Sequence, residues 1–330
     1  MNGKQIEKLL VDGKPFFGGQ TNIATQNLPK DAIQKIQLYQ EKDPTKVPGI
    51  DDNTKKDSLY SMNIKLKEDK KNGLFGKVSA GYGTDKRYDG YGVIQAYDPK
   101  NQVGIAFGLD NTNKTDGIGA NAFLENTFKQ SFMFYRYGDP AISVIKKNIW
   151  WSGKFQHSFN ETNNGQFFSR LTGDYTYTNT NLNNINKTDQ TDNLIDYKQR
   201  SISSSNSDNT TRKHEANLIY ESRRQYGDYI NINSHFNQAN NDNTNTSINN
   251  VFRNDTAIST NKVSTHSSNR STDIRVGGNM SSNDFQNNKS PLKNYSLYFN
   301  VNYNKGSSLS NTNNVFHSFI DSIPSSTIIR

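Results

Sequence analysis

The sequence contains no cysteine, which excludes a disulfide framework and cysteine-ligated zinc sites. It also lacks any run approaching the ~18 apolar residues that a membrane-spanning helix needs. Its start, MNGKQIEKLLVDGK, has no apolar segment of the kind found in a signal peptide. Hydrophobic residues make up only 32% of the 330 positions, and the mean hydropathy is -0.90. This hydrophobic content is low for a chain that would form one or two domains with water-free cores.

Polar residues fill three long tracts instead. Asn, Ser and Thr dominate residues 178–211, 237–271 and 305–327, and such tracts bury too little surface to offset the entropy lost on ordering. We therefore expect them to be long mobile loops. The net charge is +8, but Lys and Arg are scattered and no nucleic-acid-binding module is visible. Nucleic acid is not an expected partner.

Residues 1–71 have the pattern of a small mixed α/β unit. The segment KLLVDGKPF predicts a short strand entering an Asp-Gly turn, and NLPKDAIQKI predicts a helix with Pro29 in its first turn. The segments IQLY and MNIKLK each predict a further short strand. We expect this unit to precede a larger one at residues 72–330.

From residue 73 onward the sequence alternates between apolar and polar residues, which is the pattern of a β-strand. In QVGIAFGLD, Val103, Ile105, Phe107 and Leu109 share one face. Each such run is near the ~9–11 residues that a tilted membrane strand needs. Nine strands are predicted, near residues 74–83, 90–97, 102–111, 148–159, 166–178, 211–222, 229–237, 270–283 and 293–304.

The connections alternate between short and long, except that the first link, 84–89, is short where a long one is due. Short turns are expected at 98–101, 160–165, 223–228 and 284–292, and long outer loops at 112–147, 179–210, 238–269 and 305–330. This order is typical of outer-membrane barrels. The apolar faces carry no charge, and the opposite faces carry Lys77, Asp110, Lys154, Asp174, Glu215, Asp273 and Arg275. The predicted fold is mainly all-β: an open, partial antiparallel transmembrane β-barrel of about nine strands, preceded by the small α/β unit.

Four segments resemble the TonB-dependent receptor-like outer-membrane β-barrel proteins. They are VDGKPFFGG, NLPKDAIQKIQLYQEKD, MNIKLKEDKKNGLFGKVSAGYGTDKRYDG and GLDNTNKTDGIG. By this resemblance Leu28 to Tyr39 belongs to a plug domain, Asn63 to Lys67 closes the plug, and Gly73 to Gly83 forms the first wall strand. The specific match covers about residues 9–120 and is architectural beyond them. Residues 1–71 would then be the C-terminal half of a plug.

The resemblance implies a function and partners. The chain is expected in the cell outer membrane, in contact with its lipid, as a transport receptor for a siderophore, glycan or other nutrient ligand that passes through a plugged barrel. Inner-membrane energy would come from the TonB energy-coupling complex, which contacts a part of the protein before this region. Family members form barrels of about 22 strands, so we expect this chain to be an internal fragment, with Met1 inside the plug and Arg330 in an outer loop.

No catalytic constellation is found, and the protein is not expected to be an enzyme. GIGANA matches a dinucleotide-binding glycine pattern but lacks the strand-helix context that such a site needs. The five histidines are scattered. The oxygen-rich segments DNTNKTDG and GIDDNTKKD could hold calcium, but neither fits the EF-hand register, so Asx-rich turns are the favoured interpretation. No metal and no cofactor are expected.

A ligand-facing lid is predicted in the loop 112–147. Its aromatic segment FKQSFMFYRY supplies Phe132, Phe134, Tyr135 and Tyr137, unless residues 128–135 form another wall strand. Trp150 is a further candidate, either stacking on a sugar or lying at the membrane interface, the role favoured for Trp151. The alternative to the transport function is a soluble or surface-attached β-rich binding protein, such as an adhesin. It predicts that the apolar faces pack against a second sheet.

Overall fold

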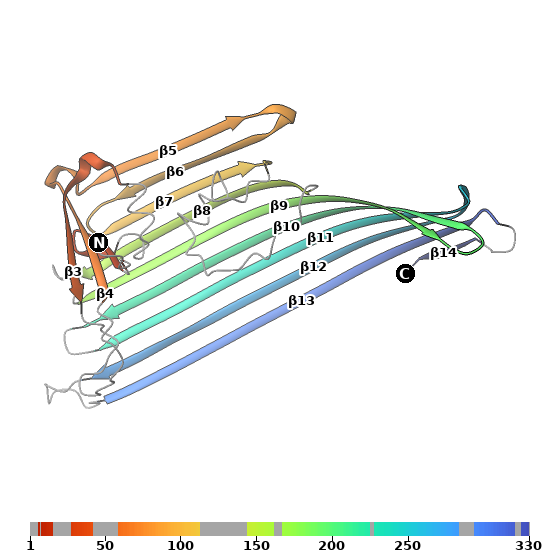
Figure 1. The fold of residues 1–330 in the computed structure, drawn as a ribbon. Helices are drawn as coiled ribbons and strands as arrows, with labels where there is room; N and C mark the ends of the chain where they lie inside the picture. The colour runs from red at the N-terminus through yellow and green to blue at the C-terminus, as the bar shows by residue number, and fades with distance from the viewer. Residues whose placement is uncertain are drawn as a thin grey trace.

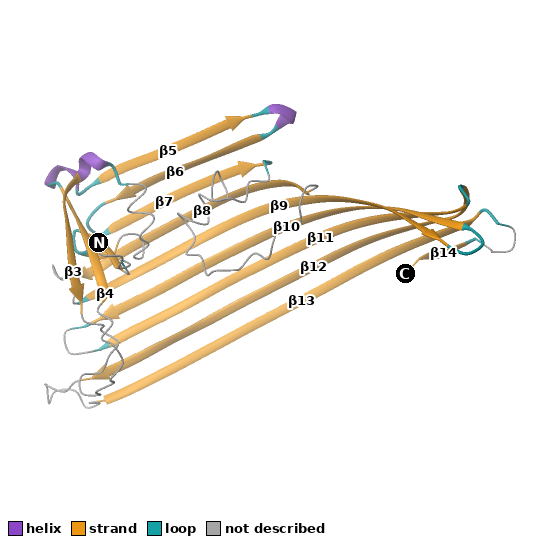
Figure 2. Cartoon of the chain, in the orientation of Figure 1, coloured by secondary structure: helices purple, strands orange, loops and turns teal. Residues whose placement is uncertain are grey.

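The computed structural model describes residues 6, 8–15, 28–41, 59–112, 144–161, 167–224, 228–283, 294–320 and 325–329. These residues form two sheets (Figure 1). Strand is the dominant element, and the short helical turns lie at the N-terminal side of the molecule and on the β5–β6 hairpin (Figure 2). Within the described ranges, no helix is long and apolar enough to cross a membrane.

The large sheet has ten strands that follow one another in chain order, each antiparallel to the next. Its strands are β5 (Gly73–Tyr82), β6 (Tyr88–Tyr97), β7 (Asn101–Asp110), β8 (Val144–Glu161), β9 (Phe168–Asn193), β10 (Lys198–Arg223), β11 (Tyr229–Arg253), β12 (Thr256–Asn283), β13 (Asn294–Ser318) and β14 (Ser326–Ile329). Each of the first nine overlaps one of the nine predicted strands, which confirms a large antiparallel sheet. The described residues do not form a closed barrel.

The described residues of the three polar tracts predicted to be mobile loops form strands and the turns that join them, so the prediction of loops was wrong. Strands β9 to β12 are 25 to 28 residues long and project well beyond the shorter strands β5 to β7 (Figure 1). The interval 179–210 is the tip of the β9–β10 hairpin, 238–269 is the tip of β11–β12, and 305–330 holds the end of β13 and all of β14.

Side-chain hydrogen bonds explain why the polar tracts are ordered. Asn, Ser and Thr on neighbouring strands bond directly across the sheet, as Ser201 Oγ does to Asn249 Oδ1 at 2.9 Å and Ser308 Oγ to Asn269 Oδ1 at 2.6 Å. Each such cross-strand pair adds to the stability of a sheet. Composition alone therefore underestimates the order of these residues.

The small sheet has four strands in the order β2-β1-β4-β3. They are β1 (Lys8–Val11), β2 (Lys14–Pro15), β3 (Ile33–Glu41) and β4 (Leu59–Leu66), with β1 and β4 parallel. The chain changes from this sheet to the large one between Leu66 and Gly73. The assignment of the two units to a plug and a barrel wall remains a prediction.

The helix predicted in NLPKDAIQKI is absent. Only a 3-10 turn, Lys30–Ala32, follows Pro29, and β3 begins at Ile33. Antiparallel pairing of β3 with β4 outweighs the weak helix propensity of the segment. The described part of this unit is therefore β with short 3-10 turns instead of α/β.

Candidate functional site

The large sheet has two faces of opposite chemistry, and we name them by the residues of β7. The outer face carries Ile105 and the inner face carries Ala106. Ile105 is 57% exposed, whereas Ala106 is fully buried. The strand registers then assign every other position, because side chains alternate and paired residues share a face.

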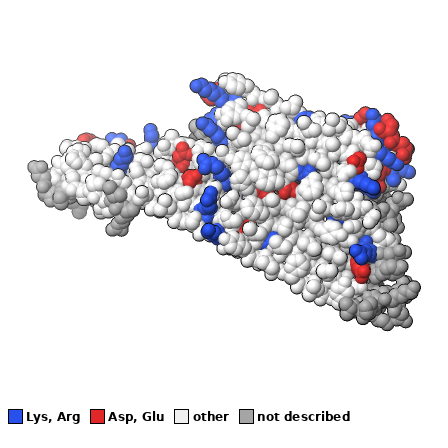
Figure 3. Space-filling model, turned by 180° about the vertical axis from the view of Figure 1, so that it is seen from behind, with Lys and Arg blue, Asp and Glu red and all other residues white. Residues whose placement is uncertain are grey.

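The outer face is apolar and exposed over a continuous band, which we call the apolar band. At its described positions no Asp, Glu, Lys or Arg occurs from the turn end of the sheet up to the level of Ile149 and Tyr303. Its exposed members include Leu74, Val78, Ile94, Val103, Ile105, Phe107, Leu109, Ile149, Trp151, Phe155, Leu218, Ile232, Ile274, Leu297, Phe299, Val301 and Tyr303. Seen from this side, the broad part of the sheet is mainly uncharged, with small scattered patches of charged atoms (Figure 3). No second sheet packs on it among the described residues.

Aromatic and histidine side chains gather on the outer face where the apolar band ends. The Trp151 and Tyr175 rings lie 4.8 Å apart, and the Tyr177 ring lies 4.9 Å from the His214 ring. The Tyr175 hydroxyl and His214 Nδ1 are hydrogen-bonded at 2.7 Å. Such amphipathic rings, with an apolar body and a polar group, are the kind of side chain enriched at a membrane-water interface.

The inner face is polar. The registers place on it all seven charged residues predicted there. Around β6 to β9 it is also buried: the exposed fraction is 9% or less for Gln95, Gln102, Asp110, Asn148, Ser152, Lys154, Gln156 and Thr176. A buried polar face opposite an exposed apolar face is the reverse of a water-soluble sheet.

Hydrogen bonds link the inner-face side chains across several strands. Asn217 Nδ2 donates to Asp174 Oδ2 at 2.9 Å, and His235 Nδ1 lies 2.7 Å from Asn217 Oδ1. Nearer the turns, Arg170 Nε donates to Glu221 Oε2 at 2.8 Å. The side chains of this network satisfy one another, which reduces the desolvation cost of holding charge on the inner face.

The small sheet packs on the inner face of the large sheet, and the contact is made through Tyr97 of β6. Tyr97 joins the apolar cluster of the small sheet, which contains Leu9, Val11, Leu28, Ala32, Ile64 and Leu66. Its hydroxyl donates to the Lys70 carbonyl at 2.9 Å. Lys14 Nζ adds a bond to the Pro99 carbonyl at 3.1 Å, in the turn after β6. The small sheet is therefore anchored on the inner side of the large sheet, near its turns.

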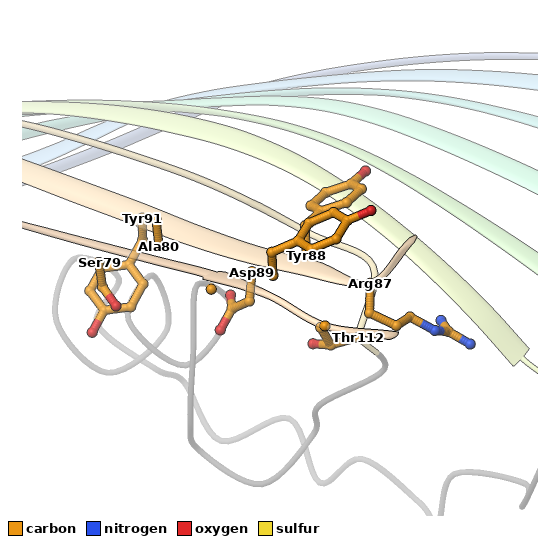
Figure 4. A pocket seen from close by; sticks show the side chains of 10 residues that line it. Ser79, Ala80, Arg87, Tyr88, Asp89, Tyr91 and Thr112 are labelled. Carbon is orange, nitrogen blue, oxygen red and sulfur yellow. The ribbon is translucent and has the colours of Figure 1, made fainter. Parts of the chain in front are cut away.

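A pocket of about 410 Å³ lies at the β5–β6 hairpin. Figure 4 shows Ser79, Asp89 and Tyr91 on one side of this hairpin and Tyr88 on the other. Asn111 fixes the corner of the pocket, because its Oδ1 accepts from the Tyr88 backbone N–H at 2.7 Å and its carbonyl accepts from Arg87 Nη1 at 2.6 Å. Hydroxyl, carboxylate and guanidinium groups line the pocket, so it suits a polar ligand.

The lid residues predicted in the loop 112–147, Phe132, Phe134, Tyr135 and Tyr137, lie outside the described residues, so the lid stays a prediction. Trp150 is described. It is 1% exposed on the inner face, where it packs with Val93 and Ala106. In this arrangement Trp150 is a core side chain, and a ligand would reach it only after neighbouring groups move.

The histidines are dispersed over five strands and bond to local polar side chains. His157 contacts Asn101, His214 contacts Tyr175, His235 contacts Asn217, His266 contacts Thr244 and His317 contacts Ser325. Among the residues that the structure describes, no group of three or more metal-binding side chains occurs. The two oxygen-rich segments considered for calcium fall largely outside the described ranges.

Sequence patterns missed the pocket corner at Asn111 and the outer-face cluster around His214. Neither has a local motif, because each depends on residues brought together by strand register.

Known protein-family models do not match this chain, and no curated protein sequence is significantly similar to it.

Proposed function

We propose that this chain belongs to the wall of an outer-membrane transport protein similar to the TonB-dependent receptors. The observation that carries the proposal is the apolar band, a charge-free and exposed outer face opposite a polar inner face. In water the band would expose a large contiguous apolar surface, which soluble monomers rarely carry. In a bilayer the same surface would contact acyl chains instead of water, which lowers the free energy of the protein.

The height of the apolar band supports a lipid location. From Tyr295 to Lys305 the strand β13 advances ten residues, or about 33 Å. At the ~40° tilt of membrane barrels this corresponds to about 25 Å, the height of the apolar zone in such proteins. The aromatic cluster around Tyr175 lies at the upper end of this band, which supports an interface at that level.

The inner side supports a role in passage of a polar cargo. Its hydrogen-bonded side chains would line an aqueous interior. The small sheet is anchored on the inner side through Tyr97, which supports its proposed role as part of a plug. Uptake of a siderophore, glycan or other nutrient, with energy supplied through TonB, follows from the resemblance and is part of this proposal. The projecting hairpins of β9 to β13 would face the outside and meet the cargo first.

The alternative is a soluble or surface-attached β-rich binding protein. It requires the apolar outer face to pack against a second sheet. The exposed fractions of Ile105, Val301 and Leu297, at 57%, 64% and 56%, favour the membrane proposal.

Two experiments test the proposal. The expressed full-length product should sediment with membranes and resist extraction by high salt and by alkaline carbonate, whereas release by high salt would contradict membrane insertion. For transport, a strain lacking the protein should lose growth on one member of a panel of iron chelates and glycans. Uptake of that compound should stop in wild-type cells when a protonophore collapses the inner-membrane potential. Uptake unaffected by the protonophore would contradict an energised mechanism.

A further inference from the structure

A row of cations lies on the outer face immediately above the apolar band. It consists of Lys147, Arg212, Arg270 and Lys305, from strands β8, β10, β12 and β13. The side chains of all four are exposed. Figure 3 shows Lys and Arg side chains in one line between the uncharged part of the sheet and its projecting end. We name these four residues the cation row.

Strand register shows that the cation row is continuous. Arg212 is paired with Asn240, which is paired with Arg270, so the two arginines are two strands, or about 10 Å, apart in one row. Lys305 is paired with Thr272, one step nearer the apolar band, and Lys147 with Asn181, one step beyond. This diagonal course compensates for the tilt of the strands, so the four cations lie at a similar height.

The row carries more positive charge than its neighbours neutralise. Arg212 has one carboxylate partner, Asp242, at 3.4 Å, and Arg270 donates to the neutral Asn240 Oδ1 at 2.9 Å. Among the described residues, Lys147, Arg270 and Lys305 form no ion pair. The nearest acidic groups on this face, Asp242 and Asp208, lie beyond the row, on the side away from the apolar band.

We propose that the cation row binds the phosphate groups of anionic lipids in the leaflet around the protein. This inference rests on the proposed membrane location. Lys and Arg can lay their aliphatic stems along the apolar band while their charged ends meet head groups. The order apolar band, aromatic cluster, cation row and acidic residues matches the order acyl chain, interface, phosphate and water. An anionic partner at this height also relieves the repulsion between four like charges.

The test uses the full chain folded into phosphatidylcholine vesicles that contain spin-labelled phosphatidylglycerol or spin-labelled phosphatidylcholine. The immobilised fraction of each labelled lipid gives its relative affinity for the protein surface. Wild-type protein should prefer phosphatidylglycerol, and the preference should fall as salt is added. The triple variant K147Q/R270Q/K305Q should lose about fivefold in preference per cation removed. Arg212 is kept so that Asp242 retains its partner.

Two control variants separate the site from general effects of charge and folding. K187Q/K198Q/K262Q removes the same charge from the projecting part of the sheet and should keep the preference. K147R/R270K/K305R keeps the charges in place and should also keep it. Equal preference in wild type and K147Q/R270Q/K305Q would overturn the inference, as would wild-type binding of both lipids without preference. If wild-type protein immobilises neither lipid, the membrane location itself fails.

Discussion

Four glycines of the large sheet lie directly opposite an aromatic side chain of the next strand. The pairs are Gly92 with Phe107, Gly108 with Trp150, Gly173 with Phe155 and Gly278 with Phe299. In each, a Cβ on the glycine would collide with the ring. The aromatic ring covers the glycine backbone, which has no side chain of its own to shield it. Such glycine–aromatic pairs stabilise β-sheets. Conformational freedom is not what these positions need, because their φ angles are negative.

The first prediction concerns Gly108. A Cβ at this position would lie 2.5 Å from the Trp150 ring, which is buried and cannot move away without disturbing Val93 and Ala106. Gly108→Ala should lower the free energy of unfolding by about 1–3 kcal/mol, the usual cost of overpacking. Urea unfolding of the membrane-reconstituted chain measures this.

The matched control is Gly153→Ala on the adjacent strand. A Cβ at Gly153 meets no atom within 4 Å, so this variant should be as stable as wild type or slightly more stable. Equal destabilisation by both variants would contradict the role given to the Gly108–Trp150 contact.

At the scale of the element, the β11–β12 hairpin ends in a two-residue turn, Asn254 and Asp255. Both have positive φ angles, 46° and 64°, as a type I′ turn requires. Asn254 Oδ1 accepts from the Lys198 N–H at 2.9 Å, which ties the turn to β10. This turn closes the β11–β12 hairpin, whose register shifts by one residue between Val251 and Phe252 next to the turn.

The second prediction follows from that turn. Asp255→Val places a β-branched residue at positive φ and should destabilise the hairpin by about 1–3 kcal/mol, whereas Asp255→Gly should leave it unchanged or more stable. Amide hydrogen exchange of the residues flanking the turn reports both effects. Faster exchange in the glycine variant than in the valine variant would refute the conformational argument.

Adjacent residues of β13 give the third prediction. Val301 lies on the outer face with 64% of its surface exposed, and its neighbour Asn302 lies on the inner face. In a bilayer, Val301→Lys should cost about 2–4 kcal/mol because it places a charge in the apolar band. Asn302→Lys should cost far less. The readout is the urea midpoint in lipid vesicles, and equal costs would mean that the face carrying Val301 does not meet lipid.

Strand periodicity predicted much of the large sheet, because alternation such as Val103, Ile105 and Phe107 is a local property of the sequence. It could not predict how far β9 to β12 extend, since Ser201 and Asn249 become ordered only by pairing across strands. The same limit explains the helix wrongly predicted after Pro29, where pairing of β3 with β4 decides the structure. Trp150 could be placed on the inner face by alternation, but its burial depends on three strands.

At the scale of the whole molecule, the apolar band, the polar inner face, the anchored small sheet and the cation row fit one orientation in a membrane. The turns of the large sheet and the small sheet lie at one end, and the polar hairpins project from the other (Figure 1). Every part of this account depends on the outer face meeting lipid.

The absence of cysteine makes a direct measurement of that dependence possible. Single cysteines can be placed along β7, at each position from 102 to 109, and labelled with a nitroxide in the membrane-inserted chain. The collision rate of each nitroxide is then measured with oxygen, which dissolves in lipid, and with a water-soluble nickel complex. The account predicts period-two alternation, with high oxygen and low nickel access at positions 103, 105, 107 and 109. Higher nickel than oxygen access at those four positions, or no alternation along the strand, would contradict it.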